Sequence, residues 1–137
     1  MNAASVTAFP RRIPPTILIV DDDAIARCLV SDELRTYGFK VLEARSADDA
    51  FTVLDTVRID LLLVDIHLPG PRNGLDVARV AQVRLPPTQI ILASGKEDGS
   101  AIPDLDSLGL FVRKPYFVSQ MVDLVARCLN WPEFPKS

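Results

Sequence analysis

The sequence predicts an α/β fold in which a doubly wound, five-stranded parallel sheet is covered by helices on both faces. Short apolar runs alternate along the chain with longer segments whose apolar residues recur at helical spacing. The runs are nearly continuous and rich in β-branched residues, which is typical of strands buried on both faces. The 137 residues, 48% of them hydrophobic and 24% charged, are enough for one domain with a single core.

Five segments are expected to form the strands, joined by right-handed crossovers. They are residues 16–20, 40–43, 61–64, 88–93 and 110–113. The second segment, Lys-Val-Leu-Glu, is the least apolar of the five, so we expect it to form an edge strand.

Helices are expected between the strands. The first runs to about residue 37 and ends at Gly38, a residue that favours helix termination. Two others begin at the caps Ser46 and Asn73, the second of them running to about residue 84, and a last one covers 118–130. The region 97–108 contains Gly99 and Pro103, which oppose a long helix, so at most a short or irregular fourth helix is expected.

The helical spacing also predicts which residues face the core. The first helix is expected to turn inward Ile25, Cys28 and Leu29. The second is expected to share one face among Ala47, Ala50, Phe51 and Leu54, and the last among Val118, Met121, Val122, Val125 and Leu129. Cys28 and Cys128 are accordingly interpreted as buried free thiols.

The two ends of the chain are expected to lie outside the domain. Residues 1–15 are interpreted as a flexible arm, residues 16–130 as the domain, and residues 131–137 as a tail too short to be an output module. The net charge of −3 gives no general attraction to nucleic acid or anionic membranes. No apolar stretch approaches the roughly 20 residues of a membrane span, and free thiols favour a reducing compartment, so a cytoplasmic location is expected.

Polar residues come directly after four of the five expected strands. Asp21, Asp22 and Asp23 come after the first, Asp65 after the third, Ser94 after the fourth and Lys114 after the fifth. Ligands of parallel α/β sheets bind beyond the carboxyl ends of the strands, so we expect these groups to converge there.

The converging residue types indicate phosphoryl transfer to a carboxylate. Several carboxylates repel one another unless a cation lies between them, and hard oxygen ligands suit Mg²⁺. A carboxylate is a competent nucleophile toward phosphorus. Lys114 can neutralise phosphoryl oxygens and Ser94 can donate a hydrogen bond to them. Asp23 is expected to act only as an acid in the first turn of a helix.

Four segments then resemble a known family. The stretches ILIVDDD (17–23), LLLVDIHLPG (61–70), IILASG (90–95) and FVRKPY (111–116) are similar to the four signatures of response-regulator receiver domains of two-component signalling. The resemblance covers residues 16–130 and implies a flavodoxin-like fold with strand order 2-1-3-4-5. Because only seven residues come after residue 130, the single-domain type of regulator, with no output domain, is expected.

The resemblance implies a role for each converging residue. Asp21 and Asp22 would be the acidic pair that holds Mg²⁺, and Asp65 would be both phosphoacceptor and metal ligand. The backbone carbonyl of His67 would complete the protein ligands. Lys114 would pair with the phosphoryl oxygens, and the peptide bond between it and the next residue, a proline, would be cis.

The resemblance further implies a switch and a gate. Ser94 would bind the phosphoryl group and change rotamer, with Phe111 as its aromatic partner. His67 and Lys96 would gate the hydrolytic water, and because neither is an amide or an acid, slow self-dephosphorylation is expected.

The function implied is that of a phosphoacceptor switch that promotes its own phosphorylation, rather than an enzyme. The phosphodonor would be a histidine kinase or a histidine phosphotransfer protein, and the signal would pass to a protein target or onward by phosphotransfer. Direct nucleic-acid binding and membrane insertion are not expected, and a homodimer would use the 97–130 face.

Two alternatives stay open at this stage. A receiver-like binding module that is never phosphorylated is disfavoured by the intact set of site residues. A phosphatase of the haloacid-dehalogenase type is disfavoured because Ala24 and Ile25 stand where that family has glycine and a hydroxyl residue. A single-domain regulator and a relay receiver are not distinguished by the sequence.

Overall fold

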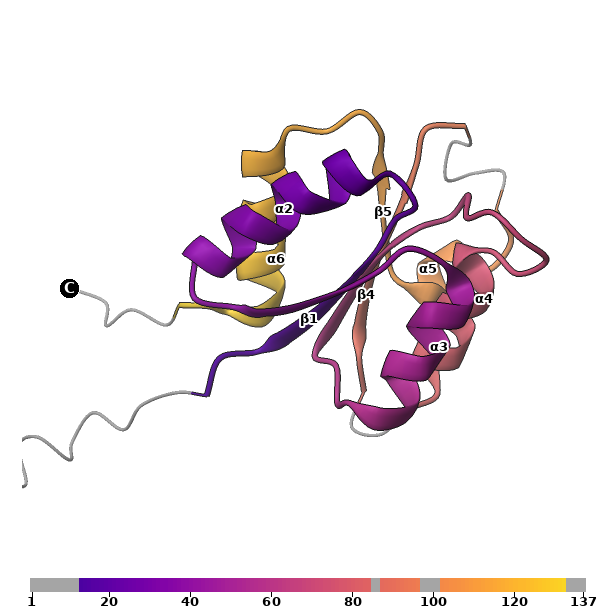
Figure 1. Ribbon diagram of the computed structural model, residues 1–137, viewed down its shortest axis with the longest axis horizontal. Coiled ribbons are helices and arrows are strands. Elements are labelled where there is room, and N and C mark those ends of the chain that lie inside the picture. Colours follow the sequence, from indigo (N-terminus) through magenta and orange to yellow (C-terminus); the bar gives the residue numbers. More distant parts are fainter. Residues whose placement is uncertain (1–12, 85–86, 97–101, 133–137) are drawn as a thin grey trace, which may run out of the picture.

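The computed structural model describes residues 13–84, 87–96 and 102–132, and its elements alternate along the chain (Figure 1). The strands are β1 (Thr16–Val20), β2 (Lys40–Ala44), β3 (Leu61–Asp65), β4 (Gln89–Ser94) and β5 (Leu110–Arg113). The helices are α2 (Ala24–Thr36), α3 (Ala47–Thr56), α4 (Gly74–Gln82), α5 (Leu105–Leu108) and α6 (Val118–Leu129).

The five strands form one parallel sheet in the order β2-β1-β3-β4-β5. The predicted fold class is therefore confirmed, including the edge position of β2. Because all strands run in the same direction, their carboxyl ends lie at one edge of the sheet, where Val20 pairs with Val64 and Asp65 with Ala93.

The helices form a layer on each face of the sheet (Figure 1). Helices α2 and α6 cover one face, and Ile17 and Ile19 of β1 point toward them. Helices α3, α4 and α5 cover the other face, and Leu18 and Val20 of β1 point toward them. Successive side chains of a strand point to opposite faces, so a strand covered on both sides must be apolar throughout. Each fully buried Leu, Ile or Val contributes about 1.5–3 kcal/mol to stability.

Side-chain caps begin three of the helices. The carboxylate of Asp23 accepts hydrogen bonds from the amides of Ile25 and Ala26, so this residue is the N-cap of α2 rather than an acid of its first turn. Ser46 caps α3, and Asn73 forms a capping box with Asp76 at the start of α4.

The expected inward face of α2 is wrong. Ile25 is 75% exposed, Leu29 is 56% exposed and Cys28 is also exposed, so the interpretation of Cys28 as a buried thiol is wrong too. The buried residues are Val30, Ser31 and Leu34. The prediction failed because the inner face of the helix carries a serine, which a hydrophobic pattern does not select. Cys128 is half-buried.

The inward faces predicted for the other helices are confirmed. In α3, Ala47, Ala50 and Leu54 are buried, and Phe51 packs against them. In α6, three of the five expected residues are fully buried and the others lie half-buried against the same cluster: Met121, Val122 and Val125, then Val118 and Leu129.

The fourth helix is short, as expected, because α5 has only four residues. Residues 97–101 of the same expected region lie outside the described residues, as do 1–12 of the expected arm and 133–137 of the expected tail.

The first residue of the expected tail belongs to the domain. The Trp131 ring lies 6.1 Å from that of Phe39, and its indole N–H donates to the carbonyl of Tyr37 at 3.1 Å. Next to Tyr37, Gly38 has a φ of +96°, which ends α2 and which residues with a side chain rarely adopt. The C-terminus of α6 is thus joined to the turn between α2 and β2.

Among the described residues, no helix is long and apolar enough to cross a membrane.

Candidate acidic site at the carboxyl edge of the sheet

Asp21 comes directly after β1 and is the most firmly held residue of the site. Its amide donates to the carbonyl of Ala44 at 3.1 Å, and its side chain is buried. One carboxylate oxygen accepts from the amide of Asp23 at 2.9 Å, and the other accepts from the ammonium of Lys114 at 2.9 Å. The sharp turn from strand to helix therefore directs this carboxylate toward the end of β5.

Asp65 is the last residue of β3, the central strand of the sheet. Its Oδ1 atom accepts from the amide of His67 at 3.0 Å, and its Oδ2 atom accepts from Lys114 at 3.1 Å. Gly74 lies against the same backbone, since a Cβ atom there would stand 2.0 Å from the carbonyl oxygen of Asp65. Only glycine at the start of α4 permits this approach.

Lys114 connects the two carboxylates. Burial alone would lower the pKa of its ammonium, but the hydrogen bonds and charges of Asp21 and Asp65 outweigh burial and raise the pKa above its ordinary value. Its side chain reaches across the end of the sheet from the loop after β5, where the bond to Pro115 is cis, as expected. Lys114 is therefore charged at any physiological pH.

Three carboxylates could share a metal ion. Oxygen atoms of Asp21, Asp22 and Asp65 all lie within 4.8 Å of one another. Ligands around Mg²⁺ in an octahedron with bonds of about 2.1 Å would lie roughly 3–4 Å apart, so small movements would suffice. The donor set consists of hard, charged oxygens, and the residues present thus fit this metal. The carbonyl of His67 as a further ligand stays a prediction.

Ser94 lies at the end of β4 and is fully buried. Its hydroxyl oxygen accepts a hydrogen bond from the amide of Lys96 at 3.1 Å, and its carbonyl accepts from the amide of Lys114 at 2.9 Å. Phe111 pairs with Leu92 in the sheet, so its side chain shares a face with that of Ser94. Phe111 is half-buried against the core. The proposed rotamer exchange between the two stays a prediction.

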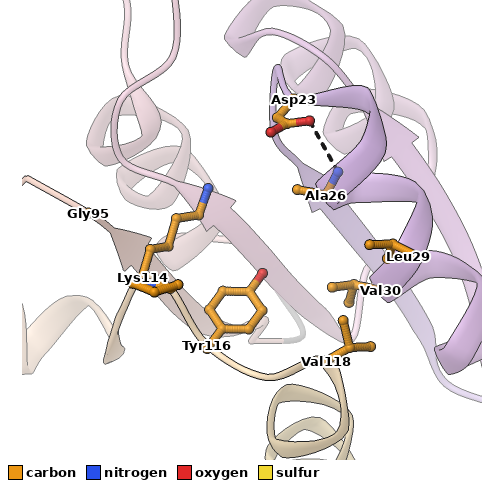
Figure 2. Close-up of a pocket in the computed structure, with 9 residues that line it drawn as sticks. Asp23, Ala26, Leu29, Val30, Gly95, Lys114, Tyr116 and Val118 are labelled. Carbon is orange, nitrogen blue, oxygen red and sulfur yellow. Dashed lines mark hydrogen bonds between the residues drawn. The ribbon is translucent and has the colours of Figure 1, made fainter.

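A cavity of about 420 Å³ opens beside the site (Figure 2). One wall is formed by the N-cap and first turns of α2: Asp23, Ala26, Leu29 and Val30. The other wall is formed by the residue after β4 and by the chain from the end of β5 to the start of α6: Gly95, then Lys114, Pro115, Tyr116 and Val118. Burial raises the pKa of the Tyr116 hydroxyl, and its ring lies between Lys114 and Val118 in Figure 2. The sequence patterns did not indicate this cavity, because its walls come from distant segments.

All the residues expected to carry the chemistry are therefore adjacent: Asp21, Asp22, Asp65 and Lys114 form one cluster. Ser94 and the backbone of His67 border it. Lys96 is exposed, and its backbone amide donates a hydrogen bond to the hydroxyl of Ser94. Arg27, which donates to the backbone of Asp21, was not identified from the sequence, since no motif marks it.

The fold and the site together define a class of protein. Its members have a doubly wound parallel sheet, and carboxylates surround a lysine at the carboxyl ends of the strands. The family model described as the response regulator receiver domain matches residues 17–126. The chain belongs to that family, whose members are phosphoacceptor switches of two-component systems and interact with histidine kinases and downstream targets.

Individual relatives agree with this membership. The chain is 35% identical over 82 residues to the autoinducer 1 sensor kinase/phosphatase LuxN of Vibrio campbellii, a match that covers 60% of this chain and 10% of LuxN. It is 31% identical over 107 residues to the DNA-binding response regulator MtrA of Mycobacterium leprae, covering 77% and 47%. The chain thus spans less than two thirds of the length of either relative.

A solved structure shares the fold. The response regulator receiver domain protein (CheY-like) of Methanospirillum hungatei superimposes with a TM-score of 0.78 at 22% identity. The superposition covers 86% of this chain and 95% of that one. At this identity the likeness concerns the fold alone.

Proposed function

We propose that this chain is a phosphorylation switch in which Asp65 accepts a phosphoryl group from a phosphohistidine. The observation that carries the proposal is the position of Lys114, whose ammonium bonds to the carboxylates of both Asp21 and Asp65. A carboxylate at the end of a central strand, held against a charged lysine, has the groups that phosphoryl transfer requires.

In the proposed reaction a carboxylate oxygen of Asp65 forms a bond to phosphorus while the bond from phosphorus to the donor's imidazole nitrogen breaks. The imidazole keeps the electron pair and takes a proton from solvent. Lys114 would turn from the carboxylate toward the phosphoryl oxygens and stabilise their charge, as the hydroxyl of Ser94 would by donating a hydrogen bond. The amide of His67 holds the other oxygen of Asp65 and orients the nucleophile.

Magnesium is the proposed cofactor, held by Asp21, Asp22 and Asp65. Bound there, it would neutralise the phosphoryl oxygens and reduce the repulsion between the three carboxylates. Asp21 is already oriented by Lys114 and by the amide of Asp23, so binding requires little rearrangement of its side chain.

The proposed phosphodonor is a protein, either a histidine kinase or a histidine phosphotransfer protein. This is supported by exposed apolar side chains of α2 and of the loop before α6, of which Leu29 lines the cavity beside the site. Ile25 and Leu29 of α2 are mostly exposed, and Phe117 in the loop before α6 is 73% exposed. Large apolar side chains that are exposed add little to the core, and beside a site they are typical of surfaces that bind other proteins. A cytoplasmic location is proposed with it, since that is where such donors act.

Acetyl phosphate with Mg²⁺ provides the test, because a small donor bypasses protein recognition. We expect the intact mass to rise by one phosphoryl group and peptide analysis to place that group on Asp65. The variant Asp65→Asn, which keeps the shape and removes the nucleophile, should not be labelled. Equal labelling of the variant, or a phosphoryl group elsewhere, would contradict the proposal. Absence of labelling in the unaltered chain would favour a module that is not regulated by phosphorylation.

A further inference from the structure

Arg27 of α2 reaches from the helix to the backbone of the acidic site. Its side chain is only 17% exposed. One terminal nitrogen donates to the carbonyl oxygen of Asp21 at 2.6 Å, and the Nε atom donates to Oε1 of Glu43 at 3.0 Å. The guanidinium is planar and its donors diverge in fixed directions, so binding to Glu43 also fixes the direction of the bond to Asp21.

This hydrogen bond holds the one polar atom of Asp21 that the rest of the site leaves unheld. The amide of Asp21 bonds to the carbonyl of Ala44, and its two carboxylate oxygens bond to Asp23 and to Lys114. Its carbonyl oxygen accepts from Arg27. With all four atoms engaged, Asp21 has a single orientation.

The bond also determines where Asp22 stands. The carbonyl of Asp21 is part of the planar peptide unit that joins it to Asp22, so fixing the oxygen fixes the plane from which Asp22 departs. Among the described residues, no hydrogen bond or ion pair holds the carboxylate of Asp22, which is exposed. Its place beside Asp21 and Asp65 is therefore set by the backbone, and Arg27 orients that backbone.

Glu43 holds Arg27 in turn. This residue of the edge strand β2 bonds through Oε2 to Arg35 at 3.1 Å while Oε1 bonds to Arg27. Arg35 also donates to the carbonyl of Val41. The two arginines thus make similar contacts, each with Glu43 and one backbone carbonyl, and Arg35 has a further ion pair with Asp32 at 3.6 Å. Only Arg27 contacts the acidic site.

We propose that Arg27 is a positioning residue for the metal site, and that Glu43 keeps it in place. The inference rests on the proposed function, because it assumes Mg²⁺ at Asp21, Asp22 and Asp65. A positioning role and a purely electrostatic role predict opposite changes in Mg²⁺ affinity when Arg27 is replaced. A cation close to a divalent metal weakens metal binding, so removing its charge alone should strengthen it. Removal of a positioning group should weaken it.

The test is calorimetric titration of the full chain with MgCl₂, with urea unfolding measured in parallel. We expect Arg27→Ala to weaken Mg²⁺ binding roughly tenfold, the size expected when one charge-assisted hydrogen bond is lost. Arg35→Ala is the matched control and should leave Mg²⁺ affinity within about twofold, even where it lowers stability to the same extent. Arg27→Lys, which keeps the charge but lacks the planar fork that bonds to Glu43 and Asp21 together, should recover part of the affinity.

A second variant covers the case in which Arg27→Ala does not fold. Glu43→Gln keeps the shape of the side chain and weakens its hold on both arginines, of which only Arg27 contacts the acidic site, so Mg²⁺ affinity should fall by roughly threefold. Unchanged or tighter Mg²⁺ binding in a folded Arg27→Ala or in Glu43→Gln would overturn the inference, as would an equal loss in Arg35→Ala. Absence of Mg²⁺ binding by the unaltered chain would overturn the proposed function and this inference with it.

Discussion

Helices α2 and α3 both come after a strand and begin at a side-chain cap, yet they place their apolar residues in opposite ways. In α3 the apolar side chains of Ala50 and Leu54 are fully buried. In α2 the apolar side chains of Ile25 and Leu29 are mostly exposed, whereas the hydroxyl of Ser31 is fully buried. The apolar face predicted for α3 thus points to the core, whereas the face predicted for α2 points to solvent and its core side carries Val30, Ser31 and Leu34.

The difference arises from the surroundings of each helix. α2 begins at the acidic site, and Leu29 lines the cavity next to Lys114. α3 begins after the edge strand, and its contacts are with β1, β2 and α4. Exposed apolar residues beside a site are evidence of a surface used for binding, and buried ones are evidence of packing. Substitutions in the two helices can separate these two roles.

The largest expected effect is on the free energy of unfolding, when the same substitution is made in each of the two helices. Leu54→Ala should lower the free energy of unfolding by about 2–5 kcal/mol, because it leaves a cavity in a filled core. Leu29→Ala should lower it by less than about 1 kcal/mol, since the side chain is already exposed to water. Urea unfolding of both variants measures the difference. Similar losses in both would mean that Leu29 is part of the core after all.

A second effect concerns the proposed phosphodonor. The double change of Ile25→Ser with Leu29→Ser should slow phosphotransfer from a histidine phosphotransfer protein by roughly tenfold, because partner contacts are lost. The rate with acetyl phosphate should stay the same. Val83→Ser is the control, as Val83 is 76% exposed and lies at the far end of α4. An equal effect of the control, or of the double change on both donors, would exclude a specific docking role.

The smallest effect concerns the buried serine. The hydroxyl of Ser31 has no hydrogen-bond partner among the described residues. Ser31→Ala should therefore raise the free energy of unfolding by about 1 kcal/mol, by removing an unsatisfied group and adding helix propensity. In α3, Thr52→Ala gains helix propensity but loses the hydrogen bond from the exposed hydroxyl of Thr52 to the carbonyl of Asp48, and should change stability by less than about 0.5 kcal/mol. A destabilised Ser31→Ala would indicate a partner for the hydroxyl.

The sequence predicted the strands and the polar residues at their ends because both depend on local order along the chain. A continuous apolar run such as Leu61 to Val64 has few uses other than a buried strand, and the residue directly after such a run must lie at the edge of the sheet. The convergence of Asp21, Asp65 and Lys114 could be predicted from parallel strands alone.

The features that the sequence did not predict depend on contacts between distant segments. Arg27 bonds to Glu43, which lies 16 residues away in the sequence, and to the backbone carbonyl of Asp21. No residue spacing predicts this arrangement. The predicted orientation of α2 failed for a similar reason, since a partly buried arginine and a buried serine occupy its inner side. A hydrophobic pattern does not detect polar residues that face inward.

The contact of Trp131 with Tyr37 has a practical consequence. Trp131 is the single tryptophan of the chain, and it lies where α6 and α2 end, at the edge of the sheet opposite the acidic site. Its fluorescence should therefore report the separation of these two helix ends during unfolding while remaining insensitive to metal or phosphoryl groups bound at Asp65. Trp131 is therefore an intrinsic optical probe of folding, placed away from the proposed site of phosphorylation.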